Sequence, residues 1–267
     1  MAMISHQTIA LEGRQAKYWI GGSGRPLVLI HGGLGDAQQH WAPVFEVFSE
    51  HFQILAPDLP GFGVSAPLPM PSYQNYLNWL QQLLDMLNIG GPLFLMGNSF
   101  GAVLSRFFAA ENTSYVSRLV LIDGGAVIDA PGCARPFIRL PGISSLVFNL
   151  IRKRAYSIAG LKRAIDDEKL LTPEFVANAE AASFGFVAAQ RQIVLSAPPS
   201  LRTPTCPTLV IWGERDRLSP VDNGRRIAAE INGAKFTVIP QAAHMPQIEQ
   251  PAAFQQLVQP FLQGATS

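Results

Sequence analysis

A serine placed between two glycines is the most specific chemical signal in the chain. The string Gly97-Asn98-Ser99-Phe100-Gly101 follows a short apolar run and precedes a helical pattern. A strand-to-helix turn tight enough to expose a serine hydroxyl requires glycine two positions before and after it. In such a turn the N–H of Phe100 faces a developing oxyanion at the start of a helix. The spacing therefore predicts that Ser99 is a nucleophile.

A serine hydroxyl needs a base to take its proton, and His244 is the predicted base. It lies just past the last strand-like run, in the segment from Gln241 to Pro246. Loops that follow parallel strands meet at the edge of the sheet where ligands bind. The other four histidines all precede Ser99, and His31 among them is predicted to be a packing residue of a glycine-rich loop.

The base in turn needs a carboxylate to orient it, and Asp216 is the favoured candidate. It follows the apolar run Thr208–Trp212 after a glycine and two further residues, so its short side chain can turn back over the strand end. Glu214 and Asp123 are the rivals, and we expect Glu214 to be solvated or paired with a neighbouring arginine. The chain order of nucleophile, acid and base is characteristic of one fold.

A second oxyanion donor is expected from the loop His31-Gly32-Gly33-Leu34-Gly35-Asp36, which follows an apolar run. Its glycines let the backbone approach a ligand, and the N–H of Leu34 or of Gly33 is the expected donor, with Leu34 preferred. The loop has neither the glycine spacing of a dinucleotide site nor the Lys-Ser/Thr of a phosphate-binding loop. The sequence therefore predicts no cofactor and no metal.

The elements that position these residues are short apolar runs separated by helical patterns. The clearest helix covers Tyr73–Ile89, with Ser72 as N-cap and a stop at Gly90, and a second helix follows Ser99 to about Ala110. Strands alternating with helices predict a mostly parallel sheet covered on both faces, and residues 1–22 predict an antiparallel edge hairpin. The predicted strands are Leu27–His31, Phe52–Ala56, Leu93–Met96, Arg118–Ile122, Thr208–Trp212 and Phe236–Ile239.

The long gap between Ile122 and Thr208 predicts an inserted helical subdomain at residues 130–200. The chain then divides into a first core part at 1–129, the insertion, and a second core part at 201–267. The insertion has an excess of basic residues, which either draws in an anionic substrate or reflects solvated helix faces. Its aromatic side chains pack within it or line an apolar pocket; they are Phe137, Phe148, Tyr156, Phe175, Phe184 and Phe186.

Composition excludes several classes of protein. There are 20 Lys and Arg against 19 Asp and Glu, so no net field favours nucleic acid or an anionic membrane. Two cysteines, Cys133 and Cys206, make no disulfide framework and fit a reducing compartment. No apolar run reaches the roughly 18 residues of a membrane span, and no leader pattern is visible. We expect a cytoplasmic protein that acts on a small molecule; whether it forms a homo-oligomer stays open.

Taken together, these motifs resemble the α/β-hydrolase fold superfamily. The resemblance rests on His31-Gly32, the segment Asp58–Ser65, the turn at Ser99, the loop from Gly213 to Asp216, and His244, and it spans nearly the whole chain. It implies a mostly parallel central sheet flanked by helices, a helical cap inserted after the sixth strand, and a Ser-Asp-His serine hydrolase. Haloalkane dehalogenases and epoxide hydrolases place an aspartate where Ser99 stands, so their chemistry is not expected. Asp58–Ser65 is expected to be structural.

The resemblance implies hydrolysis of a carboxylic ester through an acyl-enzyme, with Gly33, Asn98 and Met245 as substrate contacts. The alternative is carbon–carbon bond hydrolysis, because Asn98 before the nucleophile resembles the meta-cleavage-product hydrolases. Those enzymes usually carry a Ser-Gly-Pro-Gly type loop and a Trp after the catalytic histidine, where this chain has Gly33-Leu34-Gly35 and Met245. A slow hydrolase that acts as a ligand receptor is a further alternative, and lactone, thioester or perhydrolase chemistry stays open.

Overall fold

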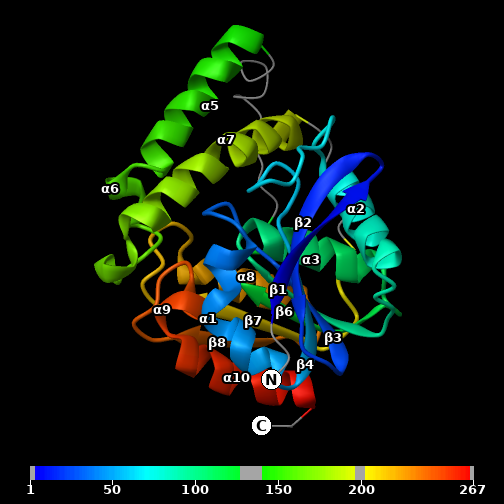
Figure 1. Cartoon of the computed structure of the whole chain (residues 1–267). Helices are drawn as coiled ribbons and strands as arrows, with labels where there is room; N and C mark the ends of the chain where they lie inside the picture. The colour runs from blue at the N-terminus through cyan, green and yellow to red at the C-terminus, as the bar shows by residue number, and fades with distance from the viewer. Residues whose placement is uncertain (1–3, 127–139, 196–201, 265–267) are drawn as a thin grey trace.

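A computed structural model describes residues 4–126, 140–195 and 202–264 of the chain. The predictions that concern Cys133, Phe137 and the boundaries of the inserted segment lie outside these residues. Among the described residues, eight strands form one sheet in the order β1-β2-β4-β3-β5-β6-β7-β8 (Figure 1). The β1–β2 and β2–β4 pairs are antiparallel and the others parallel, which confirms the predicted mostly parallel sheet. The strands are β1 Ser5–Leu11, β2 Arg14–Gly21, β3 Arg25–Ile30, β4 Phe52–Pro57, β5 Leu93–Asn98, β6 Val116–Ile122, β7 Thr208–Gly213 and β8 Lys235–Ile239.

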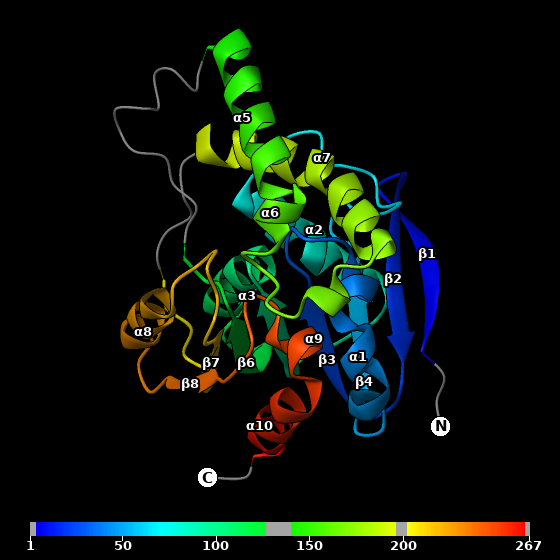
Figure 2. The ribbon, with the colours of Figure 1, turned by 90° about the vertical axis from the view of Figure 1, so that its left-hand side faces the viewer.

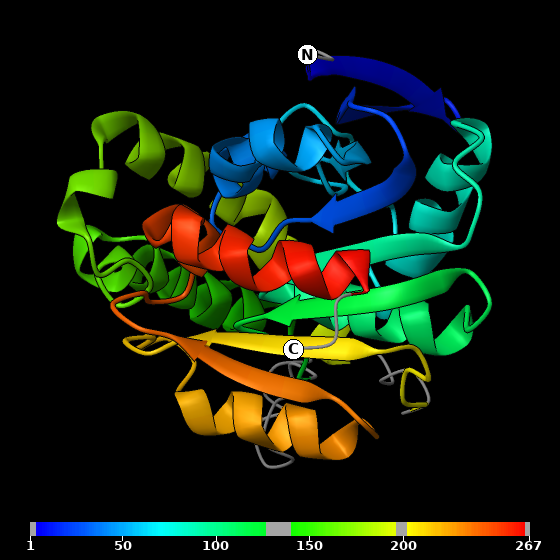
Figure 3. The same cartoon turned by 90° about the horizontal axis from the view of Figure 1, so that it is seen from below.

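Helices cover both faces of the sheet, because successive side chains of a strand point to opposite faces. In β3, Leu27 and Leu29 pack with α1 (Ala37–Ser49) and α10 (Pro251–Gln263). The intervening Val28 and Ile30 belong to the apolar cluster of the other face. That face carries α2 (Tyr73–Met86), α3 (Phe100–Glu111) and α8 (Val221–Glu230) (Figure 3). The doubly covered sheet explains why its central strands read as continuous apolar runs.

The predicted edge hairpin is confirmed. β1 and β2 pair from Ser5 with Ile20 to Leu11 with Arg14. The turn residues Glu12 and Gly13 have φ of 49° and 75°. Positive φ at both central residues is the geometry of a tight hairpin turn whose twist matches that of the strands.

The end of α2 differs from the prediction. Ser72 caps the helix as expected, since its hydroxyl accepts a hydrogen bond from the N–H of Asn75 at 3.1 Å. The helix ends at Met86 rather than Ile89. Asn88 takes a left-handed φ of 54°, and the Ile89 N–H donates to the Leu84 carbonyl at 2.9 Å. A left-handed residue closed by such a bond terminates a helix, and asparagine is one of the residues that adopts it readily.

The described part of the chain between β6 and β7 is helical, and it lies over one end of the sheet (Figure 2). Helix α7 closely approaches the loop that holds Gly61. A Cβ atom built on Gly185 would stand 1.8 Å from the Gly61 carbonyl oxygen, so no side chain fits there. The assignment of this segment as a separate cap stays a prediction. Its helices are α5 Pro141–Ala155, α6 Ile158–Leu161, the 3₁₀ turn η1 Glu168–Leu170, and α7 Pro173–Leu195.

Candidate active site

Ser99 occupies a strained turn between β5 and α3. Its φ of 55° and ψ of −115° lie where residues other than glycine rarely go. A Cβ atom on Gly97 would stand 2.3 Å from the Gly101 carbonyl oxygen, and one on Gly101 would stand 2.2 Å from that of Ile30. Both glycines are therefore required by close backbone contacts. The Ser99 N–H donates to the Ile122 carbonyl at 2.8 Å, which fixes the turn to the end of β6.

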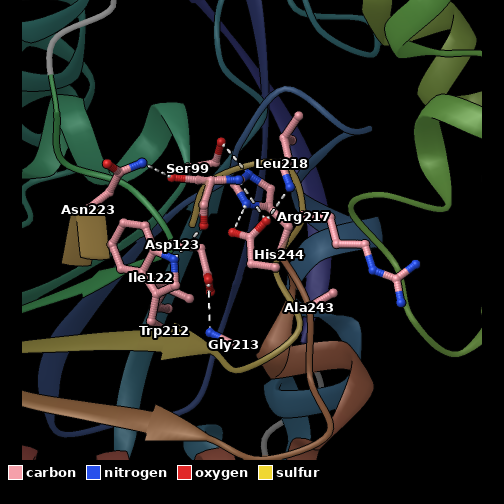
Figure 4. A network of polar contacts seen from close by, with 12 residues as sticks. Ser99, Ile122, Asp123, Trp212, Gly213, Arg217, Leu218, Asn223, Ala243 and His244 are labelled. Atoms are coloured by element: carbon pink, nitrogen blue, oxygen red, sulfur yellow. Dashed lines mark hydrogen bonds and ion pairs between the residues drawn. The ribbon is translucent and has the colours of Figure 1, made fainter. Parts of the chain in front are cut away.

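The three residues predicted as nucleophile, base and acid lie in hydrogen-bond contact. Nε2 of His244 is 2.8 Å from Oγ of Ser99, and Nδ1 of His244 is 2.7 Å from Oδ2 of Asp216. They come from the ends of β5, β7 and β8, which are far apart in sequence and meet at one edge of the sheet (Figure 4). His244 and Asp216 are buried. Because the Asp216 carboxylate accepts at Nδ1, the His244 tautomer that exposes Nε2 to the serine hydroxyl is favoured.

Asp216 is held in place by its own loop. Its Oδ1 accepts from the backbone N–H groups of Leu218 and Ser219, each at 2.8 Å, which leaves Oδ2 for His244. Backbone donors of this kind stabilise the ionised form of a carboxyl group. The loop after β7 therefore presents a fixed carboxylate to the imidazole ring.

The two rival acids make other hydrogen bonds. Asp123 is buried at the end of β6, where its Oδ1 accepts from the Gly213 N–H at 2.9 Å. Glu214 is exposed, and its Oε2 accepts from the Gln241 N–H at 3.2 Å. In the described part of the chain, neither carboxyl group is hydrogen-bonded to His244.

The loop after β3 supplies backbone N–H groups near Ser99. The N–H groups of Leu34 and Phe100 donate no hydrogen bond within the described residues, and both residues line the cavity beside Ser99. Phe100 is the first residue of α3, where an N–H has no partner within the helix. A Cβ on Gly32 would stand 2.9 Å from the Cβ of Ser99, so glycine is needed for the loop to approach the turn.

His31 fixes the shape of that loop. The Leu59 N–H donates to Nε2 of His31 at 2.8 Å, so Nδ1 carries the proton and donates to the Gly32 carbonyl at 2.7 Å. Burial lowers the pKa of His31 to about 4, which keeps the ring neutral and able to accept. The ring thus joins the loop after β3 to the Asp58–Ser65 turn. This agrees with the structural role predicted for both.

His40 lies close behind the same loop and was not singled out from the sequence. Its Nδ1 faces the Gly32 N–H at 3.4 Å, and the ring lies 5.6 Å from that of His31. Complete burial, with the neighbouring His31 as a second cause, holds the pKa of His40 well below its ordinary value. A neutral His40 therefore supports the glycine-rich loop from beneath.

A cavity of about 660 Å³ opens above Ser99, between the strand ends and the helices that follow β6. Gly33, Leu34 and Phe100 line it, whereas Asn98 and Met245, predicted as substrate contacts, are absent from its described lining. Asn98 is buried and donates from Nδ2 to the carbonyl groups of Ile122 and His244. Met245 packs in an apolar cluster with residues of the inserted helices. Both side chains therefore hold the loops together in this structure.

Several lining residues were not predicted as site residues. Arg154 lines the cavity from α5, Arg163 from the turn after α6, and Trp212 from β7. Tyr156, predicted only as a packing or pocket aromatic, donates from its hydroxyl to the Gly33 carbonyl at 2.8 Å. The excess of basic residues in the insertion was the one sequence signal for the arginines. Nothing in the local sequence distinguishes Tyr156 from the other aromatics.

A further question is whether these residues form a metal centre. One ligand atom from each of Asp123, Asp216 and His244 lies within 4.8 Å of the others. Both ring nitrogens of His244 are already engaged, one by Asp216 and one by Ser99. A ring in this state has no lone pair left for a metal ion. The arrangement favours a hydrogen-bond network suited to nucleophilic catalysis.

Comparison with known proteins gives the family. The model of the alpha/beta hydrolase family matches residues 27–257. The chain belongs to this family. Among relatives of this alpha/beta hydrolase, the 2-hydroxy-6-oxo-6-(2'-aminophenyl)hexa-2,4-dienoic acid hydrolase of Metapseudomonas resinovorans is 27% identical, covering 94% of this chain and 88% of the relative. The chain is therefore a hydrolase, in agreement with the prediction from sequence.

Solved structures divide between two kinds of hydrolase. A thermophilic esterase from Thermogutta terrifontis has a TM-score of 0.77 and 25% identity, with all of both chains covered. A meta-cleavage product hydrolase from Pseudomonas fluorescens IP01 has a TM-score of 0.76 and 25% identity, covering 97% of this chain and 98% of the other. This alpha/beta hydrolase is similar to both classes. In its described residues, no helix combines the length and apolarity that a membrane crossing requires.

Proposed function

We propose that this hydrolase cleaves carboxylic esters of small or medium apolar substrates through an acyl-enzyme on Ser99. The observation that carries the proposal is the hydrogen-bond path from Oγ of Ser99 through the His244 ring to Asp216, with distances of 2.8 Å and 2.7 Å. A hydroxyl in contact with an oriented imidazole is activated for attack on a carbonyl carbon.

The reaction follows from that path. Nε2 of His244 takes the Ser99 proton as Oγ attacks the ester carbonyl, and Asp216 stabilises the imidazolium. The N–H groups of Phe100 and Leu34 receive the oxyanion, where a lost donor costs roughly 3–4 kcal/mol of transition-state stabilisation. His244 then protonates the leaving alcohol. Water, deprotonated by the same ring, releases the carboxylic acid from Ser99.

The cavity supports a substrate of moderate size with an apolar body. Its volume of about 660 Å³ lies within the usual range for small-molecule sites. Phe186, Val187 and Trp212 offer apolar lining, and Phe186 also contacts Phe100 with ring centroids 5.4 Å apart. An acyl chain or aromatic group fits this surface.

The nucleophile is tested with p-nitrophenyl butyrate. Ser99→Ala is expected to abolish turnover while the thermal melting temperature stays nearly the same, because the hydroxyl contributes chemistry rather than packing. Ser114→Ala, at an exposed position beyond α3, is the matched control and keeps wild-type rates. Retained turnover in Ser99→Ala would remove Ser99 from the mechanism.

Carbon–carbon bond hydrolysis is the second candidate, and two observations favour it. Several curated relatives have names of hydrolases that act on oxo-dienoic acids, including the 2-hydroxy-6-oxo-6-phenylhexa-2,4-dienoate hydrolase of Burkholderia cepacia. Arg154 and Arg163 line the cavity as exposed cations. A substrate of this class would place its carbonyl at Ser99 and its carboxylate toward the arginines.

A side-by-side panel separates the two candidates. Values of kcat/KM are measured for p-nitrophenyl esters, lactones, thioesters and an oxo-dienoate. The ester series includes substrates with and without a carboxylate group. For carboxylate-bearing substrates, Arg154→Ala is expected to lower kcat/KM by about tenfold. Lys153→Ala, exposed on the same helix but absent from the described cavity lining, is the control. Equal effects of both variants would remove the arginine from substrate binding.

A further inference from the structure

A second buried carboxyl group, that of Asp123, lies beside the Ser99–His244–Asp216 path and has no role in the proposed mechanism. Asp123 directly follows β6, with a left-handed φ of 46°, and its N–H donates to the Ile211 carbonyl at 3.0 Å. Its Oδ1 accepts from the Gly213 N–H at 2.9 Å. The side chain is 1% exposed and is therefore sealed against the end of β7 (Figure 4).

The other oxygen of Asp123 is unusual. Within the described residues, Oδ2 is buried and has no hydrogen-bond donor. One oxygen each of Asp123 and Asp216 and a ring nitrogen of His244 lie within 4.8 Å of one another. Two ionised carboxylates this close in a buried site repel strongly, so one of them holds a proton.

The donors around the pair decide which carboxyl is protonated. Asp216 accepts three hydrogen bonds, from the N–H groups of Leu218 and Ser219 and from the His244 ring, all of which favour its ionised form. Asp123 accepts only one, from Gly213. Burial and the adjacent Asp216 carboxylate raise the pKa of Asp123 well above its ordinary value. The shared proton therefore resides on Asp123.

We propose that Asp123 is a positioning residue that stays protonated at Oδ2 and donates this proton as a hydrogen bond to the Asp216 carboxylate. The proposal rests on the proposed function, because Asp123 acts through Asp216. The added hydrogen bond fixes the orientation of Asp216 toward Nδ1 of His244. Because Asp123 is neutral, the His244 ring faces one carboxylate charge, that of Asp216, rather than two.

The surrounding charges are consistent with this assignment. The titratable groups that act on Asp123 are Asp216 from the loop after β7, His244 from the loop after β8, and Glu249 of α9 (Pro246–Glu249). Glu249 also opposes ionisation of Asp123, although its own carboxylate is occupied by the N–H groups of Asp166, Asp167 and Ala243. No arginine or lysine contacts Asp123 in the described structure.

The test compares Asp123→Asn with Asp123→Leu. Asparagine is neutral and isosteric, its Oδ1 still accepts from Gly213, and its amide N–H replaces the carboxyl proton. It is expected to keep kcat within about threefold of the wild type, since the donor is preserved. Leucine removes both hydrogen bonds and is expected to lower kcat by roughly 10- to 100-fold. The low-pH limb of the pH–rate profile stays in place in Asp123→Asn and moves in Asp123→Leu.

Two further outcomes overturn the proposal. If Asp123→Asn loses as much activity as Asp216→Asn, Asp123 is an ionised acid of the mechanism. If losses in both Asp123 variants follow only their melting temperatures, with the pH profile unmoved, its role is structural.

An infrared measurement tests the protonation without turnover. At neutral pH the wild type and Ser99→Ala should both show the carbonyl band of a protonated carboxylic acid, shifted in D₂O and missing in Asp123→Asn. Absence of the band in the wild type overturns the proposal for Asp123. This outcome does not depend on whether the proposed ester hydrolysis is correct.

Discussion

At the scale of single residues, Asp123 and Asp216 show how position decides the chemistry of identical side chains. Both are buried at strand ends beside His244. They differ in their donors: two backbone N–H groups and the ring hold Asp216, whereas one N–H holds Asp123. The sequence favoured Asp216 because the loop after Gly213 is long enough for the side chain to turn back. No spacing rule predicts that Asp123 lies beside the Asp216 carboxylate, because the two residues are 93 positions apart in the sequence.

Asp216→Asn is predicted to lower kcat by about 10⁴-fold, because an amide at this position favours the wrong tautomer of the ring. The measurement is steady-state hydrolysis of p-nitrophenyl butyrate with a thermal melt in parallel. Asp222→Asn is the matched control, since Asp222 is an exposed acid on α8. A fall of less than tenfold in Asp216→Asn would reassign the orienting acid.

At the scale of elements, the turn between β5 and α3 and the loop after β3 are built around each other. The backbone of Gly101 contacts the carbonyl oxygens of Ile30 and His31, so the two segments touch with no side chain between them. The sequence predicted this turn because its glycine spacing is a local property. The end of α2 was predicted three residues too late, since the left-handed Asn88 leaves no mark in the apolar periodicity.

Gly101→Ala is predicted to reduce both stability and activity, because its Cβ would lie 2.2 Å from the Ile30 carbonyl oxygen and 2.5 Å from that of His31. Backbone atoms cannot move aside cheaply, so a loss of about 1–3 kcal/mol or more is expected. Gly90→Ala is the control, with nothing within 4 Å of its Cβ and no positive φ. Urea unfolding and kcat are measured for both, and a Gly101→Ala protein as stable and active as the control would contradict the close contact.

The loop after β3 is predicted to weaken in mild acid through His31. Its folded-state pKa of about 4 lies below the ordinary value of 6.5, so the unfolded chain binds more protons between these values. This contribution to stability is complete above pH 6.5 and is lost as the pH falls toward 4. Unfolding free energies of the wild type and His31→Gln are compared from pH 7 to 4. The variant should be less stable at pH 7, but its unfolding free energy should fall less steeply toward pH 4. If the two curves of unfolding free energy against pH are parallel, His31 is not the source of the acid sensitivity.

At the scale of the whole molecule, the sheet supplies the chemistry and the inserted helices supply much of the cavity wall. The mostly parallel sheet and the meeting of Ser99, Asp216 and His244 followed from apolar runs and loop positions. The contributions of Arg154 and Arg163 did not, because they depend on how a segment more than 50 residues beyond Ser99 folds back over the strand ends. Local patterns do not specify that docking.

Substitution of Tyr156 tests how the inserted helices contact the loop after β3. Its hydroxyl donates to the Gly33 carbonyl, in the loop expected to hold the oxyanion. Tyr156→Phe is predicted to cost about 1 kcal/mol of stability and to raise KM several-fold. Tyr115→Phe is the control: its hydroxyl also donates to a backbone carbonyl, that of Ile89, and Tyr115 is absent from the described cavity lining. The Tyr115→Phe variant should lose about as much stability as Tyr156→Phe, while its KM stays at the wild-type value. If Tyr156→Phe and Tyr115→Phe have the same KM, the Tyr156 hydrogen bond has no role in substrate binding.

The close backbone contact between Gly185 and the Gly61 carbonyl is expected to limit the size of the substrates that the cavity accepts. Adding a single methyl group at position 185 would wedge α7 outward, carrying with it the adjacent Phe186 ring that packs over Phe100. A substitution at position 185, which is absent from the described cavity lining, is therefore expected to enlarge the cavity and admit bulkier molecules. Laboratory evolution toward larger substrates should find this position early.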